Sequence, residues 1–181
     1  MSEPRPREWS LDEFLDWEAR QAERWELADG QPVMMAGGTQ AQALIAVNLL
    51  TMLRPLLRGT PCRPSGSDLR VPVPATGNCR YPDITIDCGE FRPDAHDVSM
   101  PVVVFEVSDR TKKLKDYDSI PSIRQYVCLF QDEPRVSVWL RGGDGRLVPQ
   151  DDVTGLDASF TVVGIDQPLA LAGIYEGSRF A

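Results

Sequence analysis

The 181-residue sequence has one histidine, four cysteines and no long apolar run. The lack of such a run argues against a membrane-spanning helix, and the charged N-terminus lacks the apolar segment of a secretory signal. The cysteines, Cys62, Cys79, Cys88 and Cys128, form no CxxC pair and have no histidines at zinc-site spacing. We therefore expect a cytoplasmic protein without a membrane partner, whose thiols stay reduced. A Cys79–Cys88 disulfide is the less favoured alternative.

Positive charge is also scarce, because the formal net charge is −8 and the pI is about 4.7. Proteins that depend on nonspecific phosphate contacts are usually basic. A large nucleic-acid footprint is therefore disfavoured, whereas a small basic patch is not. The length and the 42% of hydrophobic residues suit one domain with a substantial core. We expect a flexible N-terminus over residues 1–9 and a single domain over residues 10–181.

Hydrophobic periodicity predicts an α/β domain with a mixed sheet and a long helix near the N-terminal hairpin. A capping box opens a helix over residues 10–18, and Asp29-Gly30 predicts a tight turn between two short strands. Helical spacing continues over residues 39–58, where Pro55 should kink the helix or end it early. Further strands are predicted over residues 69–73, 81–87, 102–107, 127–131, 135–141, 146–150 and 159–163, and short helices over 109–120 and 169–175.

Three carboxylates, Glu26, Asp83 and Glu106, stand in predicted strands that are otherwise largely apolar. Each has an ordinary explanation: Glu26 and Asp83 as exposed strand residues, and Glu106 as the partner of Arg110 or Lys113. Burial of an unpaired carboxylate costs several kcal/mol, and three acids on one sheet face would repel one another. A divalent cation removes both problems. Oxygen ligands without histidine or cysteine favour Mg²⁺ or Mn²⁺.

Five segments of the chain resemble successive blocks of a known protein family. They are WELADGQPVMMAGG, GSDLRV, YPDITI, VVVFEVS and KKLKDYDSIPSIRQYVCL. In this order, over about residues 10–175, they are similar to the Uma-type putative restriction endonuclease family of the PD-(D/E)xK nuclease superfamily. The resemblance implies a restriction-endonuclease-like core, which is an α/β (α+β) fold with a mixed sheet flanked by helices. It also implies a Mg²⁺-dependent endonuclease that hydrolyses DNA phosphodiester bonds.

The resemblance assigns the catalytic site to four side chains, which are Glu26, Asp83, Glu106 and Lys113. In this interpretation Mg²⁺, or alternatively Mn²⁺, is held by Asp83, Glu106 and the backbone carbonyl of Val107. Glu26 would hold the same metal directly or through water, or hold a second metal. Lys113 would orient or deprotonate the attacking water, and Lys115 is the alternative lysine.

A small basic cluster follows the third carboxylate, and we expect it to contact phosphate. The expected substrate-binding residues are Arg110, Lys112, Lys115 and Tyr117. Tyr117 belongs to this set because it shares a helix face with Lys113. The ordinary explanation of the lysines is a solvated helix face. A symmetric homodimer would place two such sites on the two strands of a DNA duplex.

The chain departs from the family pattern in three places. The superfamily lysine usually lies two residues after the strand glutamate, where this chain has Ser108. The segment that follows Glu106 is shorter than in the family, and Gln42 stands where the family often has a histidine. These departures leave open a catalytically inactive nuclease fold that binds a partner or dimerises. A relic of a mobile element is a third interpretation, which the four intact site residues disfavour.

Overall fold

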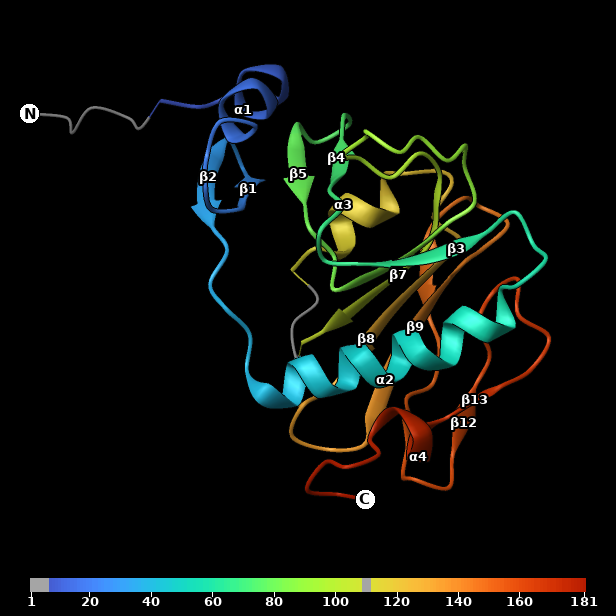
Figure 1. Ribbon diagram of the computed structural model, residues 1–181. Helices are drawn as coiled ribbons and strands as arrows, with labels where there is room; N and C mark the ends of the chain where they lie inside the picture. Colours follow the sequence, from blue (N-terminus) through green and yellow to red (C-terminus); the bar gives the residue numbers. More distant parts are fainter. Residues whose placement is uncertain (1–6, 109–111) are drawn as a thin grey trace, which may run out of the picture.

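The computed structural model describes residues 7–108 and 112–181, and these residues fold around a seven-stranded sheet (Figure 1). Its strands follow the order β10-β9-β8-β7-β6-β3, and β11 pairs with β9. The β7–β8 pairing is parallel and the others in this sheet are antiparallel, so the sheet is mixed, as predicted. The strands are β3 Arg63–Gly66, β6 Ile84–Asp87, β7 Pro101–Val107, β8 Gln125–Leu129, β9 Arg135–Arg141, β10 Leu147–Pro149 and β11 Val153–Thr154.

The sequence predicted a single mixed sheet, but the structure also contains a smaller antiparallel sheet in the order β2-β1-β5-β4. Its strands are β1 Trp25–Ala28, β2 Gln31–Met34, β4 Val71–Val73 and β5 Asn78–Arg80. A separate antiparallel pair consists of β12 Ser159–Phe160 and β13 Leu169–Ala170. The sequence pattern missed β3 and β5, because each has only three or four residues and no alternation that marks a strand.

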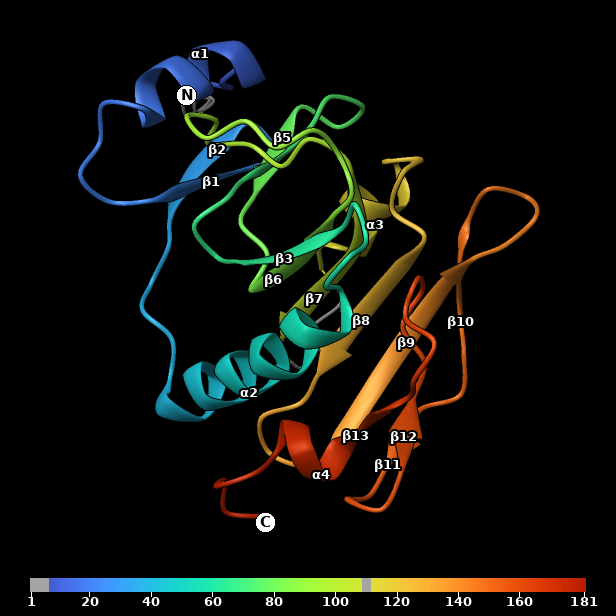
Figure 2. The ribbon, with the colours of Figure 1, turned by 45° about the vertical axis from the view of Figure 1, so that its right-hand side comes forward.

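The helices are α1 Leu11–Glu18, α2 Gln40–Leu56, α3 Leu114–Asp118 and α4 Leu171–Ile174. Helices α2 and α3 lie on opposite faces of the large sheet (Figures 1 and 2). Alternate residues of β7 point to opposite faces: Phe105 packs with Leu49 of α2, and Val104 packs with Tyr117 of α3. The site therefore forms on the α3 face. In the described ranges, none of the helices has both the length and the apolar character of a bilayer span.

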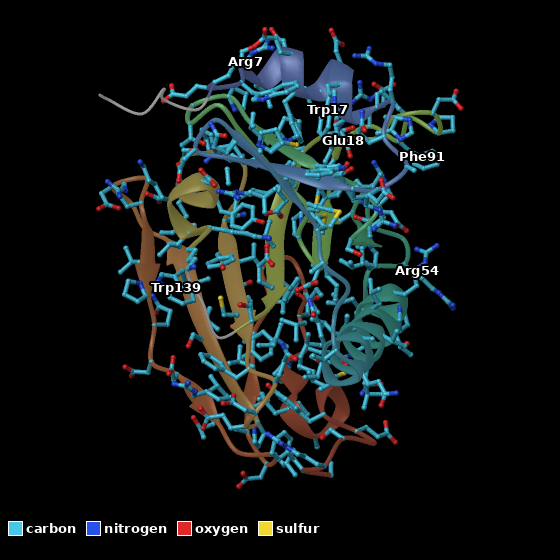
Figure 3. The ribbon with its side chains drawn as sticks, turned by 90° about the vertical axis from the view of Figure 1, so that its left-hand side faces the viewer. Arg7, Trp17, Glu18, Arg54, Phe91 and Trp139 are labelled. Carbon is cyan, nitrogen blue, oxygen red and sulfur yellow. A yellow bond between two sulfur atoms is a disulfide. The ribbon has the colours of Figure 1, made fainter. Side chains whose placement is uncertain are left out.

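The N-terminal elements form as their sequence predicts. The Ser10 hydroxyl caps α1 in a capping box, and the β1–β2 turn places Asp29 at φ 49° and Gly30 at φ 73°. Helix α1 covers the smaller sheet, and Figure 3 shows Trp17 and Glu18 beneath it, near the strands. A small apolar cluster of α1, β1 and β5 residues joins these elements.

Helix α2 differs from its prediction in two respects. It continues through Pro55 and ends at Leu56, so the proline lies in the final turn without ending the helix early. The helix packs against β3, β7 and α4 rather than against the N-terminal hairpin. Arg54 projects away from the body of the protein (Figure 3).

Two of the four cysteines are paired, which corrects the expectation of four reduced thiols. The β3–β6 register places Arg63 opposite Asp87, so the adjacent residues Cys62 and Cys88 face each other and form a disulfide. The alternative Cys79–Cys88 pairing is also wrong, since Cys79 is a buried free thiol in another sheet. Cys128 is the second buried free thiol.

A thiol count tests the disulfide. Protein denatured without reductant should react with Ellman's reagent at two cysteines, and reduced protein should react at four. Reduction should also destabilise the fold by about 3 kcal/mol, because the bond closes a loop whose ends are 26 residues apart. Four reactive thiols before reduction would contradict the pairing.

Candidate active site

Asp83 and Glu106 lie level with each other on neighbouring strands of the large sheet. The β6–β7 register pairs Ile84 with Phe105, so the residue before Ile84 lies opposite the residue after Phe105. Paired residues on adjacent strands stand about 5 Å apart. The Asp83 carboxylate also accepts the backbone N–H of Val107 at 2.7 Å. The geometry thus brings two of the three predicted acids together.

Lys113 joins the third acid to this pair. Its ammonium nitrogen lies 2.7 Å from Glu26 Oε1 and 3.2 Å from Glu106 Oε1. Glu26 comes from β1 of the smaller sheet and Glu106 from β7 of the larger, so the lysine bridges the two sheets. The Lys113 side chain is 25% exposed, which leaves the bridge partly open to solvent. The sequence alternative, Lys115, is exposed on α3.

Tyr117 lies beneath Glu106. Its hydroxyl donates to Glu106 Oε1 at 2.6 Å. The residue is 0% exposed, because its ring belongs to the apolar cluster that includes Val104 and Tyr126. A fully buried hydroxyl has no open side for a substrate. Tyr117 was expected to contact the substrate. In the structure its buried hydroxyl holds the Glu106 carboxylate instead.

Two glutamines contact the proposed metal ligands Asp83 and Val107. Gln42, in the first turn of α2, donates to Asp83 Oδ1 at 2.8 Å. Gln131 donates to the carbonyl of Val107 at 3.3 Å, and its own side-chain oxygen accepts the Thr39 hydroxyl at 2.6 Å. Sequence reasoning noted Gln42 only as a departure from the family and missed Gln131, whose approach depends on tertiary packing that no local pattern reveals.

A buried ion pair that the sequence did not indicate completes the cluster. Arg80, in β5, donates from Nε to Asp116 Oδ2 at 2.6 Å and from Nη1 to Glu26 Oε2 at 3.3 Å. Asp116 lies on α3, one turn after Lys113. The only advance signal was an arginine directly before the YPD segment, and it did not predict a partner.

Burial and mutual repulsion shift the ionisation of the cluster. Burial raises the pKa of Glu106 to about 7; the Lys113 charge opposes this, and Asp83 and Glu26 add to it. Burial alone would lower the pKa of Lys113, but the charges of Glu106 and Glu26 outweigh burial and raise that pKa above its ordinary value. The lysine is therefore a stable cation, whereas Glu106 titrates near neutral pH.

The charge balance of the cluster suits a divalent cation. The cluster consists of the carboxylates Glu26, Asp83, Glu106 and Asp116 and the cations Arg80 and Lys113. When every acid is ionised, two negative charges are in excess. No three or more His, Cys, Asp or Glu side chains in the described part of the chain gather closely enough to hold a metal on their own.

The oxygen atoms available at the strand ends are nevertheless of the right kind. Asp83, Glu106 and the Val107 carbonyl supply two carboxylates and one backbone oxygen. Mg²⁺ commonly takes one or two protein carboxylates and keeps several waters, and hard oxygen ligands suit Mn²⁺ as well. These residues therefore fit such an ion with water completing its shell.

The predicted phosphate-binding residues are only partly placed. Lys112 and Lys115 are exposed on either side of Lys113, where they can meet a polyanion. Arg110 lies outside the described residues.

A cleft of about 470 Å³ opens beside Asp83, and its walls include Arg24, Gly37, Gly38, Gln42 and Ser67. Asp83 is thus reachable from the surface through this cleft.

Comparison with known proteins identifies the family. Residues 11–163 match the Uma2 family, which is described as "Putative restriction endonuclease". The chain belongs to this family. The slr1290 protein of Synechocystis sp. (strain ATCC 27184 / PCC 6803 / Kazusa), described as uncharacterized, is 30% identical over 144 residues, which span 75% of this Uma2 chain and 76% of that protein.

A solved structure supports the fold of this Uma2 chain. The crystal structure described as "a putative nuclease belonging to DUF820", from Anabaena variabilis ATCC 29413, superposes with a TM-score of 0.71 at 16% identity. The match covers 91% of this chain and 96% of the other. The predicted family and the predicted restriction-endonuclease-like fold are therefore confirmed.

The pKa of Glu106 predicts how the stability of this Uma2 chain depends on pH. The native pKa of about 7 lies above the ordinary 4.5, so the stabilising contribution is complete below pH 4.5 and is lost as pH rises through 7. In metal-free buffer, the free energy of unfolding of the wild type relative to Glu106→Gln should fall by about 3 kcal/mol between pH 4.5 and 8.5.

Urea unfolding across this pH range measures the difference. Glu176→Gln removes an exposed carboxylate and is the matched control; its curve should run parallel to that of the wild type. A difference between wild type and Glu106→Gln that stays constant with pH would contradict the assigned pKa.

Proposed function

We propose that the protein is a Mg²⁺-dependent endonuclease that hydrolyses phosphodiester bonds in DNA. The observation that carries the proposal is the placement of Asp83 and Glu106 opposite each other at a strand end, with Lys113 3.2 Å from Glu106. Membership of a family described as putative restriction endonucleases supports the same activity. The open cleft beside Asp83 supports access by a large substrate.

Asp83, Glu106 and the Val107 carbonyl would hold the metal, with Mn²⁺ as an alternative to Mg²⁺. A metal bound there would acidify a water and place positive charge beside the scissile phosphate. Glu26 would act through water, because Lys113 and the backbone N–H of Tyr81 already occupy its Oε1. Tyr117 and Gln42 would keep the two ligand carboxylates in place through their hydrogen bonds.

Lys113 would act as a fixed positive charge rather than as a general base. Its pKa is raised by two neighbouring carboxylates, so the ammonium form persists at neutral pH. In this form the side chain can orient a water and offset the negative charge that develops on phosphate. The exposed Lys112 and Lys115 would contact flanking phosphates. The same phosphate role is proposed for Arg110, from its sequence position alone.

One observation favours the second candidate, a catalytically inactive binding module. Lys113 already pairs with Glu26 and Glu106 as an internal cation, so the charge of the cluster is offset in part without any metal. A module of this kind would use the same fold to bind a partner or to dimerise. It predicts that loss of the strand-end acids leaves the binding function intact.

Metal binding separates the two candidates. Calorimetry should detect Mg²⁺ or Mn²⁺ with a dissociation constant between micromolar and millimolar, and binding should strengthen from pH 6 to 8 as Glu106 loses its proton. A variant with Asp83→Ala and Glu106→Ala should lose both the metal and plasmid cleavage. Asp94→Asn, which changes an exposed acid in a loop, should retain both.

Absence of metal binding by the wild type, with DNA present as well as absent, would remove the nuclease proposal. The binding-module proposal would then stand in its place. Cleavage that survives in the double variant would show that another site on the protein carries the activity.

We also propose a homodimer. Strand β2 is an edge strand of the smaller sheet, and Val33 and Met34 on it are exposed, which leaves both apolar side chains and backbone groups available to a second copy. Light scattering at micromolar concentration should give a mass near twice the 20.1 kDa of one chain. Met34→Lys should shift the mass toward the monomer, and a monomeric wild type would remove the proposal.

A further inference from the structure

Asp116 is a buried acid next to the site whose carboxylate accepts three side-chain hydrogen bonds. Its carboxylate accepts from Thr76 Oγ1 at 2.7 Å, from Asn78 Nδ2 at 2.9 Å and from Arg80 Nε at 2.6 Å. The side chain is only 4% exposed. All three donors come from one short segment that ends in β5, so this single carboxylate attaches α3 to the smaller sheet.

The contacts of Asp116 continue into a closed ring. Arg80 donates to both Asp116 and Glu26, and Glu26 accepts from Lys113. Lys113 returns to Asp116 through the helix, because its carbonyl accepts the Asp116 backbone N–H at 3.0 Å. Each member is therefore positioned by two others. The ring contains two side chains of the proposed nuclease centre, Glu26 and Lys113, and two that are not among its proposed catalytic or metal-binding residues.

We propose that Asp116 and Arg80 are positioning residues that fix Lys113 and Glu26 at the junction of the two sheets. The proposal rests on the proposed nuclease function of the same centre. It goes further, because it assigns a role in that function to a pair whose side chains lie outside the reacting groups.

The physical need for such a pair follows from the size of α3. The helix has five residues, which is too short to be stable on its own, and a lysine stem is flexible. A carboxylate that holds three donors fixes the helix, and with it the starting point of the Lys113 side chain. If Asp116 became neutral, Glu26 would be the one charged carboxylate partner left to Arg80 among the described residues. Glu26 would then shift from Lys113 toward Arg80.

The ordinary explanation is that the pair only stabilises the fold, and lysine NMR separates the two roles. The chain has three lysines, Lys112, Lys113 and Lys115, so protein labelled with ¹³C at the lysine ε-carbon gives three resonances. Because Lys113 alone of the three touches Glu26 and Glu106 in the described structure, its resonance can be assigned with Lys113→Arg. The spectrum reports lysine placement without any metal or DNA.

Asp116→Asn is the test variant and Asp118→Asn is its matched control. Asp118 lies on the same helix and is partly buried, but it binds Arg141, Arg146 and the backbone N–H of Leu147 instead. In Asp116→Asn the Lys113 resonance should move, Mn²⁺ affinity should fall by about tenfold, and kcat should fall by about tenfold or more with KM for DNA nearly unchanged. Asp118→Asn should keep the resonance and the Mn²⁺ affinity of the wild type.

A folded Asp116→Asn protein with the wild-type Lys113 resonance and Mn²⁺ affinity would overturn the proposal. If this variant does not fold, Arg80→Lys replaces it, because a lysine keeps the buried charge but cannot reach Asp116 and Glu26 together. The same changes are expected there. Unfolding of both variants would assign the pair to stability alone and would also overturn the proposal.

The test of Asp116 as a positioning residue can fail or succeed independently of the nuclease proposal. If the wild type neither binds Mn²⁺ nor cleaves DNA, the nuclease function fails. A Lys113 resonance that then moves in Asp116→Asn, but not in Asp118→Asn, would still support the positioning of Lys113 by Asp116. A resonance that stays in place in both variants would reject it.

Discussion

The ammonium of Lys113 between Glu26 and Glu106 is the contact on which the arrangement of the site depends. The two glutamates come from different sheets, and in a low-dielectric interior they would repel each other. One cation between them converts that repulsion into a bridge. Because the lysine lies at the start of α3, the bridge also determines where the helix sits and where Tyr117 meets Glu106.

This bridge leaves the cluster incompletely neutralised. Two cations, Arg80 and Lys113, face four carboxylates, and burial raises the pKa of Glu106 to about 7. The fold therefore maintains a carboxylate that destabilises it once ionised, which natural sequences tolerate mainly where a site needs the charge. A divalent cation at Asp83 and Glu106 would relieve this cost, so metal binding would also stabilise the fold.

The sequence predicted the parts of the site that follow from local pattern. The apolar run before Glu106 and the alternation within the YPDITID segment placed the two acids on neighbouring strands, and the Asp29-Gly30 turn placed Glu26 in a hairpin. Tertiary pairing determined the rest. Cys62 meets Cys88 only through the β3–β6 register, and Arg80 of the smaller sheet meets Asp116 of α3. The burial of Tyr117 likewise depends on which face α3 turns toward the sheet.

The central claim is that Asp83, Glu106 and the Val107 carbonyl form one metal-binding position. The most direct test is an anomalous difference map from crystals grown with Mn²⁺, recorded near the manganese absorption edge. The account predicts a single strong peak within about 2.5 Å of oxygen atoms from all three residues. A map without a peak at this strand end at saturating Mn²⁺, with Lys113 still seated between Glu26 and Glu106, would contradict the account.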